Sequence, residues 1–379
     1  MKNKMKSFLK KTIRAFLRIL PLSKTIIFES APDFSDNTKS VYDEMLRRKM
    51  NDRYKMIWFC SSDFQGEIKE KNVVVIKRGV KLGNLRKKYI LNRAKVIVCC
   101  NDFLLNWDNR QKSFYLTHGT PIKSVRSYYT IPRKIDFCVS ASEGVSQIYA
   151  HEFNYPIEKI VPLGFPRNDE LFKNVDIKAP LDTKCDKVIV WYPTFRQSKW
   201  VTTASTHALP VIHNAETAKS LNEVAKINNT LIVLKPHFAQ DLSYIKDLGL
   251  SNIRFIDDSF FVDNGISSYE FVGSCDALIT DYSSIYYDFT LCDKPIAAIW
   301  EDIEEYKQNP GLIDNYEHYM KGAEKVYTAD ELGKFVSDVA NGIDNLKEER
   351  NEIKNLVNYS TDGKNAQRVV DFIIEKAGL

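Results

Sequence analysis

The sequence lacks the motifs by which nucleotide and metal sites are most readily found. Neither GxGxxG nor GxxxxGK[ST] occurs in its 379 residues, so the common dinucleotide and P-loop phosphate cradles are absent. The seven cysteines form no CxxC pair, and the six histidines show no HxH or HExxH spacing, so we expect no metal site. Glycine and proline are scarce, at 15 and 13 residues, while 44% of residues are hydrophobic. This composition is typical of a globular protein of about two domains.

Long apolar runs are also missing. No segment carries the ~20 uninterrupted apolar residues that a membrane-spanning helix needs, and the first residues lack the apolar core and cleavage site of a signal peptide. The cysteines are odd in number and lie mostly in strand-like runs such as 94–100 (AKVIVCC). We therefore interpret them as buried, reduced thiols of a cytosolic protein.

An excess of positive charge is absent from most of the chain, although the formal net charge is +5. Residues 1–24 hold eight of the 54 Lys and Arg and no acid, so the remainder has 46 bases against 49 acids. A nucleic-acid-binding protein would carry its basic patch on the folded body, and none is visible there. We therefore expect no nucleic-acid partner.

The basic residues of segment 1–24 alternate with apolar ones at helical spacing. Phe8, Ile13, Phe16, Leu17 and Leu20 fall near one face, and Pro21 ends the pattern. The spacing predicts an amphipathic basic helix that attaches to an anionic membrane surface. The alternative is a solvated helix packed on the rest of the protein.

Short β-rich runs alternate with helical periodicity from residue 25 onward, which predicts parallel sheets built from crossover units. The fold class is thus α/β, with two Rossmann-like, doubly wound domains. We place them at 25–173 and 187–379, joined by a polar linker at 174–186. The runs that predict strands are 25–30, 54–61, 72–78, 94–100, 113–119, 135–141, 187–193, 230–236, 253–257, 277–281 and 295–300. Helical patterns occupy 40–48, 82–92, 143–153, 215–227, 284–293 and most of the chain after about residue 328, with a polar turn at 360–363.

Polar residues follow several strands of the second half, where ligands of such sheets bind. Ser283 and Ser284 stand at a predicted helix start, where free backbone N–H groups and hydroxyls favour an anion, although one serine could simply cap the helix. Lys235 and His237 end another strand, and Thr194 and Arg196 a third. Together these groups predict a pyrophosphate pocket, with Asp281 as a further candidate.

The first half offers His118, which follows a strand and suits a general base, although a core histidine bonded to a backbone carbonyl is an alternative. Arg167 either reaches the cleft or serves the domain junction. Asp169 and Asp302 are candidates both for the cleft and for helix caps, and for Asp302 we favour the cap. Thr120 and Lys123 complete the candidates.

Six segments carry a resemblance to a known family. HGTPIK (118–123), GFPRND (164–169), YPTFR (192–196), LKPH (234–237), TDYSSIYYDF (280–289) and KPIAAIWEDIEEY (294–306) resemble the CDP-glycerol glycerophosphotransferases of teichoic acid synthesis. The resemblance covers about residues 90–370 and implies a GT-B architecture with two Rossmann-like domains, the acceptor at the first and a CDP-polyol at the second. Phe238 departs from the family, which usually has proline after KPH.

The resemblance also implies site roles and partners. His118 and His237 are the expected catalytic residues, and Arg196, Lys235, Ser283 and Ser284 the expected donor-phosphate contacts. The expected reaction moves a polyol phosphate from CDP-glycerol or CDP-ribitol to a hydroxyl of an undecaprenyl-linked glycan, releases CMP and uses no cofactor. The expected location is the cytoplasmic face of the membrane, as a peripheral protein. A GT-B glycosyltransferase using a nucleotide sugar and an inactive membrane-bound scaffold are the alternatives.

Overall fold

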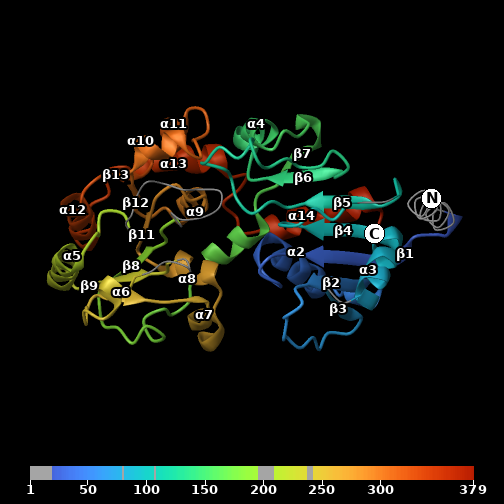
Figure 1. The fold of residues 1–379 in the computed structure, drawn as a ribbon, viewed down its shortest axis with the longest axis horizontal. Coiled ribbons are helices and arrows are strands. Elements are labelled where there is room, and N and C mark those ends of the chain that lie inside the picture. Colours follow the sequence, from blue (N-terminus) through green and yellow to red (C-terminus); the bar gives the residue numbers. More distant parts are fainter. Residues whose placement is uncertain (1–18, 79–80, 106–107, 195–208, 237–241) are drawn as a thin grey trace, which may run out of the picture. The chain divides into compact units, whose positions relative to one another are not determined.

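The computed structural model describes residues 19–78, 81–105, 108–194, 209–236 and 242–379, which divide into two α/β units (Figure 1). Unit 1 holds the described residues up to His118, Thr130–Arg167 and Lys364–Leu379. Unit 2 holds Gly119–Tyr129 and Asn168–Gly363. The chain thus passes from unit 1 to unit 2 directly after His118.

Unit 1 is built on a seven-stranded parallel sheet of order β3-β2-β1-β4-β5-β6-β7. Its strands are rich in β-branched and aromatic residues, and β4 is almost wholly buried, as a central parallel strand must be. The strands are β1 (Ser23–Glu29), β2 (Lys55–Cys60), β3 (Val73–Lys77), β4 (Ala94–Cys99), β5 (Lys112–Tyr115), β6 (Phe137–Ser140) and β7 (Ile160–Pro162).

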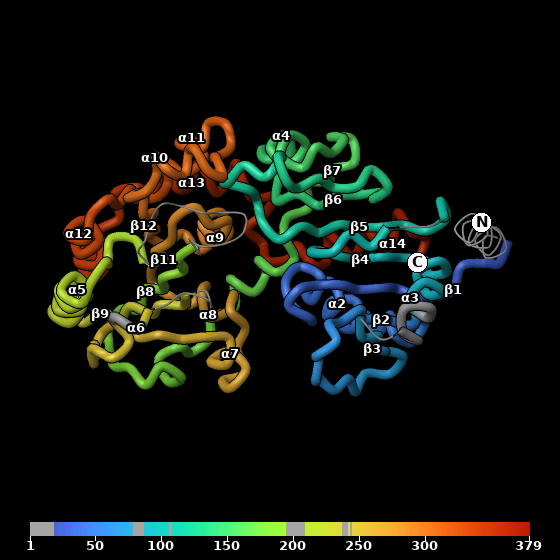
Figure 2. Tube along the Cα trace, in the orientation of Figure 1, coloured from blue at the N-terminus to red at the C-terminus, as the bar shows by residue number. Residues whose placement is uncertain are grey.

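Helices cover the unit 1 sheet, and one of them comes from the far end of the chain. The C-terminal helix α14 (Asn365–Ala377), red in Figure 2, packs against β5 and α2 (Asp36–Arg47) and buries Val369, Val370 and Ile373 in the core. In that core Phe28 stacks on Trp58 at 5.4 Å between ring centroids. The other helical elements that unit 1 contains or begins are η1 (Met50–Asp52), α3 (Lys81–Arg93), α4 (Glu143–Glu152), η2 (Ile157–Lys159) and η3 (Pro166–Phe172).

Unit 2 repeats the arrangement with a six-stranded parallel sheet of order β10-β9-β8-β11-β12-β13. Strand β9 is buried along its whole length, because helices cover both faces of the sheet. The strands are β8 (Lys187–Trp191), β9 (Thr230–Leu234), β10 (Ile253–Phe255), β11 (Ala277–Thr280), β12 (Ile296–Ile299) and β13 (Glu324–Val326).

The helices of unit 2 begin at recognisable caps. The side chain of Asn214 accepts from two backbone N–H groups of α5 (Ala215–Ile227), and Ser267 and Thr328 cap α8 (Ser268–Ser274) and α12 (Ala329–Ala340). Helices α5 and α12 pack side by side. The remaining helices are α6 (Ser243–Lys246), α7 (Asp258–Asn264), α9 (Ile285–Phe289), η4 (Thr290–Cys292), α10 (Ile303–Gln308), α11 (Tyr316–Tyr319) and α13 (Lys347–Val357).

The two-sheet α/β architecture predicted from the sequence is confirmed, but the units divide the chain differently from the predicted domains. Residues 364–379, predicted to belong to the second domain, lie in unit 1, because the apolar face of α14 packs on the unit 1 sheet. The predicted linker 174–186 lies inside unit 2, where Ile177 and Leu181 are buried. Five of the seven cysteines are buried, as predicted, and Cys185 and Cys292 are partly buried. The predicted basic helix lies almost entirely outside the described residues.

Candidate active site

The strand order of unit 2 reverses between β8 and β11, which is where open parallel sheets bind ligands. Thr194 follows β8 and Asp281 follows β11, and the structure brings them together. A carboxylate oxygen of the fully buried Asp281 accepts from the backbone N–H of Thr194 at 2.9 Å, and the other accepts from its hydroxyl. Asp281 therefore orients the turn after β8.

Ser283 and Ser284, both partly buried, occupy the same edge of the sheet, between β11 and α9. Their carbonyls accept from the N–H groups of Tyr286 and Tyr287 at 3.1 and 3.0 Å, which starts the helix. Ser284 stands at the N-cap position in a helical conformation, and its hydroxyl makes no capping bond. The alternative that Ser284 acts only as a side-chain cap is therefore wrong, because its backbone is already helical at that position.

Lys235 directly follows β9, the strand on the other side of β8. Its backbone N–H donates to the carbonyl of Trp191, and its ammonium lies 3.0 Å from Asp258 and 5.8 Å from the ring centre of Tyr192. Because Asp258 is 86% exposed, this ion pair contributes little stability, and an anionic ligand can compete for the ammonium. The predicted residues Arg196 and His237 lie outside the described residues.

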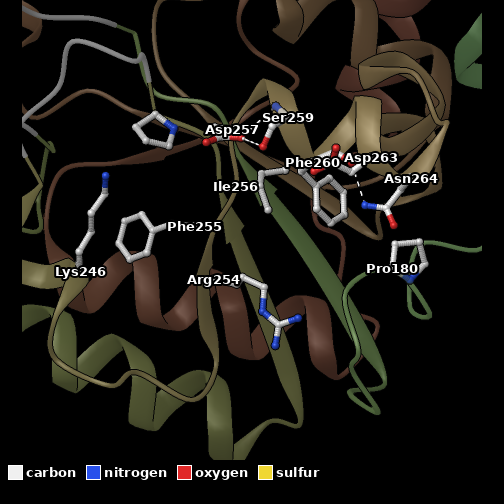
Figure 3. A pocket seen from close by; sticks show the side chains of 11 residues that line it. Pro180, Lys246, Arg254, Phe255, Ile256, Asp257, Ser259, Phe260, Asp263 and Asn264 are labelled. Atoms are coloured by element: carbon white, nitrogen blue, oxygen red, sulfur yellow. Dashed lines mark hydrogen bonds between the residues drawn. The ribbon is translucent and has the colours of Figure 1, made fainter.

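A pocket of about 570 Å³ opens beside this edge in unit 2 (Figure 3). Pro236, which directly follows Lys235, forms part of its wall, together with residues of β10 and α7. Both signs of charge line the pocket next to two phenyl rings. The lining residues include Lys246, Arg254, Phe255, Asp257, Phe260 and Asp263.

Asp302 is at the N-cap position of α10, but its side chain does not cap that helix. One carboxylate oxygen instead accepts from the hydroxyl of Tyr282 at 3.0 Å, and Tyr282 stacks on Tyr306 at 3.8 Å between centroids. The favoured prediction of a cap is therefore wrong, because a buried tyrosine hydroxyl requires an acceptor and takes this one. Tyr282 and Tyr306 were not predicted, although both stand inside the motifs quoted above.

His118 is the last residue of the first chain segment of unit 1, and it is exposed, so it is not a core histidine. Its Nδ1 lies 3.4 Å from the carbonyl oxygen of Cys100. An imidazole that donates from Nδ1 carries its lone pair on Nε2, so Nε2 is the nitrogen that can accept a proton. Thr120, two residues later, is buried, and Lys123 is partly buried.

The segment 164–169 contributes to structure on both sides of the unit boundary. In unit 1, Arg167 pairs with Asp36 at 2.7 Å while its backbone N–H donates to Asn37. In unit 2, the amide of Asn168 donates to the buried Asp288 at 2.9 Å, and Asp169 is partly buried in the first turn of η3. Arg167 therefore has the junction contacts that a structural role requires.

The switch point of unit 1 carries a charge cluster that was not predicted. Glu29 ends β1 and is fully buried, and its carboxylate accepts from the N–H groups of Asn101 and Asp102 and from Arg78 at 3.0 Å. Burial raises the pKa of this carboxyl. The hydrogen-bond donors lower this pKa, but burial has the larger effect. The signal in the sequence was an acid directly after the apolar run at 26–28.

A comparison with family models identifies the family of this chain. The model of the CDP-glycerol:poly(glycerophosphate) glycerophosphotransferases matches residues 12–375. The chain belongs to this family. As expected for a member, it is similar to the teichoic acid glycerol-phosphate primase of Bacillus subtilis (strain 168), with 22% identity over 94% of this chain and 92% of the primase. It is also 23% identical, over 99% of its length, to the teichoic acid poly(glycerol phosphate) polymerase of the same strain, but spans only 52% of that protein.

Solved structures share the fold of this chain. A variant of the wall teichoic acid polymerase TagF, soaked with CDPG, superposes with a TM-score of 0.75 at 21% identity, over all of this chain and 98% of that one. Within the described residues, no helix is both long and apolar enough to cross a membrane. The same residues include no group of three or more His, Cys, Asp or Glu arranged to hold a metal ion.

Proposed function

We propose that this chain transfers a polyol phosphate, glycerol phosphate in the first instance, from a CDP-polyol to a hydroxyl of a lipid-linked glycan. The observation that carries the proposal is the family match over residues 12–375. The edge of the unit 2 sheet supports it, because Lys235 follows β9 and Ser283 and Ser284 follow β11, the two strands that flank β8. An ammonium, two hydroxyls and a helix start suit a pyrophosphate.

In this reaction the acceptor oxygen attacks the β-phosphorus of the CDP-polyol. A new P–O bond forms, the bond from that phosphorus to the bridging oxygen breaks, and CMP leaves with the bridging oxygen. His118 takes the proton of the acceptor hydroxyl at Nε2. Lys235, Ser283 and Ser284, with Arg196 and His237 placed by sequence alone, stabilise charge on the phosphoryl group and on CMP. Asp281 acts by holding the turn that begins at Thr194.

The proposed setting is the synthesis of teichoic acid or a related surface polymer at the cytoplasmic face of the membrane. The acceptor is an undecaprenyl-linked glycan in this proposal, and segment 1–24 holds the enzyme on an anionic membrane surface. Its eight basic residues and lack of acids support this location.

The test is CMP release from CDP-glycerol and CDP-ribitol in the presence of a lipid-linked disaccharide. We expect one of these donors to be consumed, and His118→Ala to lower turnover by about 10²–10⁴-fold, because a positioned general base contributes that much. His151→Ala is the matched control: His151 is another exposed histidine of unit 1, paired with Glu152 on α4. Lys235→Ala should chiefly weaken donor binding and charge stabilisation.

Other outcomes point to the alternatives. Consumption of a nucleotide sugar with release of a nucleoside diphosphate would assign glycosyl transfer. No turnover and no binding of any CDP compound would assign the scaffold. Full activity of a folded His118→Ala variant would refute the base while leaving the transfer reaction standing.

A further inference from the structure

The backbone that follows His118 is paired with a turn nearly 200 residues away in the sequence. The N–H of Ser124 donates to the carbonyl of Gly311 at 3.0 Å, and the N–H of Ile313 donates to the carbonyl of Ile122 at 2.9 Å. Between these bonds Lys123 and Leu312 form an antiparallel bridge. Both segments belong to unit 2, so the pairing lies within one compact body.

The turn at 309–313 is itself well anchored. The N–H of Gly311 donates to the carbonyl of Tyr306 at 2.9 Å, which ties the turn to α10, and Tyr306 is fully buried. Ile313 and Ile122 are 3% and 1% exposed, so apolar burial holds each side of the pairing. Gly311 has φ +92°, a conformation that residues with a side chain rarely adopt.

His118 lies four residues before Ile122 in the chain. Its imidazole contacts the Cys100 carbonyl in unit 1, and four residues later Ile122 accepts the hydrogen bond from Ile313 in unit 2. Only Gly119, Thr120 and Pro121 separate His118 from that bond. Thr120, in the middle of this short connection, is 1% exposed.

We propose that Gly311 and Ile313 are positioning residues for the proton-accepting imidazole of His118. They act by fixing the backbone of 122–124, which follows His118 in the chain. This inference rests on the proposed role of His118 as the base. The inference gives segment 309–313, after α10, a role in the reaction. The proposed mechanism otherwise does not use this segment.

The decisive variant is Gly311→Ala. A Cβ at Gly311 would lie 3.7 Å from the Cβ of Ser124 and 3.8 Å from the carbonyl oxygen of Lys307, which are ordinary contacts. The substitution therefore acts through the backbone, because alanine disfavours φ +92°. Gly342→Ala is the matched control: Gly342 also lies in unit 2 with φ +70°, and nothing lies within 4 Å of its Cβ position.

Two readouts separate positioning from general destabilisation. We expect Gly311→Ala to lower kcat for CMP release by about 10- to 100-fold with KM for the CDP-polyol changed less than about twofold, since misplacing a reacting group costs turnover first. In protein labelled with ¹³C-histidine, the ¹H–¹³C imidazole signal of His118, assigned with His118→Gln, should shift in Gly311→Ala. It should stay in place in Gly342→Ala, and the His151 signal should stay in place in both.

A His118 signal unmoved in folded Gly311→Ala would overturn the proposal, as would equal losses of kcat in the two glycine variants. Should Gly311→Ala fail to fold, Ile313→Val makes a smaller change in the same pairing and is judged by the same two readouts. The imidazole signal does not depend on turnover. A wild-type protein that releases no CMP would therefore refute the proposed function, while the shift still decides whether Gly311 positions His118.

Discussion

At the scale of single residues, the most consequential charge in unit 1 is the buried carboxylate of Glu29. Its guanidinium partner Arg78 is 27% exposed, donates to Glu29 and to the carbonyl of Phe59, and also pairs with the exposed Asp102. A buried charge that loses its partner costs far more than an exposed one. The stability of unit 1 should therefore depend on Arg78.

We predict that Arg78→Met lowers the free energy of unfolding by about 3 kcal/mol at pH 7, because Glu29 is left buried without its cation. Burial raises the pKa of Glu29 in the folded state, so the folded state binds this proton more tightly than the unfolded chain. The stability that protonation of Glu29 contributes is thus fully present below the pKa of Glu29 in the unfolded chain. It is lost as the pH rises through the pKa of Glu29 in the folded state. Removal of Arg78 raises the pKa of Glu29 in the folded state further. The loss of unfolding free energy in Arg78→Met should therefore become smaller as the pH falls toward 5.

Urea unfolding of both proteins from pH 5 to pH 8 measures this prediction. The double variant Glu29→Gln with Arg78→Met is the control, because a neutral amide at position 29 should recover part of the loss and remove its pH dependence. A deficit of equal size at every pH would show that Arg78 acts by packing alone.

At the scale of elements, strands were predictable where apolar β-branched residues run for four or more positions. β9 and β12 are fully buried and were found from composition alone. β7 and β13, three residues long each, were missed, whereas the equally short β10 was predicted as part of the run 253–257. The partner unit of α14 was also out of reach, because its amphipathic face would fit the apolar face of either sheet.

In the candidate site, some contacts were predictable from the strand pattern, and others depend on residues far apart in the sequence. The meeting of Thr194 with Asp281 follows from a rule, because both residues follow neighbouring parallel strands. The partners of Asp302 and Arg167 obey no such rule: Tyr282 is 20 residues away from Asp302, and Asp36 is 131 residues away from Arg167. The pairing of Ser124 with Gly311 likewise depends on tertiary packing, although Asn309, Pro310 and Gly311 did form a recognisable turn signal.

The C-terminal helix yields a prediction at this scale. Ile373 of α14 is fully buried in the unit 1 core, so Ile373→Ala should lower the free energy of unfolding by about 3 kcal/mol through lost burial and the cavity left behind. Glu375→Ala, at an exposed position of the same helix, should change it by less than about 0.5 kcal/mol. Limited proteolysis should then cleave the Ile373→Ala variant first within unit 1. Cleavage first within unit 2 would contradict the assignment of α14.

At the scale of the whole molecule, the excess positive charge lies in the N-terminal segment. Residues 1–24 carry eight bases and no acid, whereas the remaining chain has slightly more acids than bases. A body without excess positive charge has no general attraction to anionic lipid. Attraction to a membrane should therefore come from the N-terminal segment.

We predict that the full chain sediments with vesicles containing about 30% anionic lipid and not with neutral vesicles, because each base near the surface contributes on the order of 1 kcal/mol. Replacing Lys10, Lys11, Arg14 and Arg18 by Gln should weaken binding by about 10²–10³-fold, less than the full sum because part of the attraction is screened. Replacing Lys69, Lys71, Lys88 and Lys95, four lysines of the body, by Gln is the charge-matched control and should leave binding within about twofold, since the prediction places the attraction in the first 24 residues. Vesicle binding that survives the first set and is lost with the second would move the membrane contact from the N-terminal segment to the surface of unit 1.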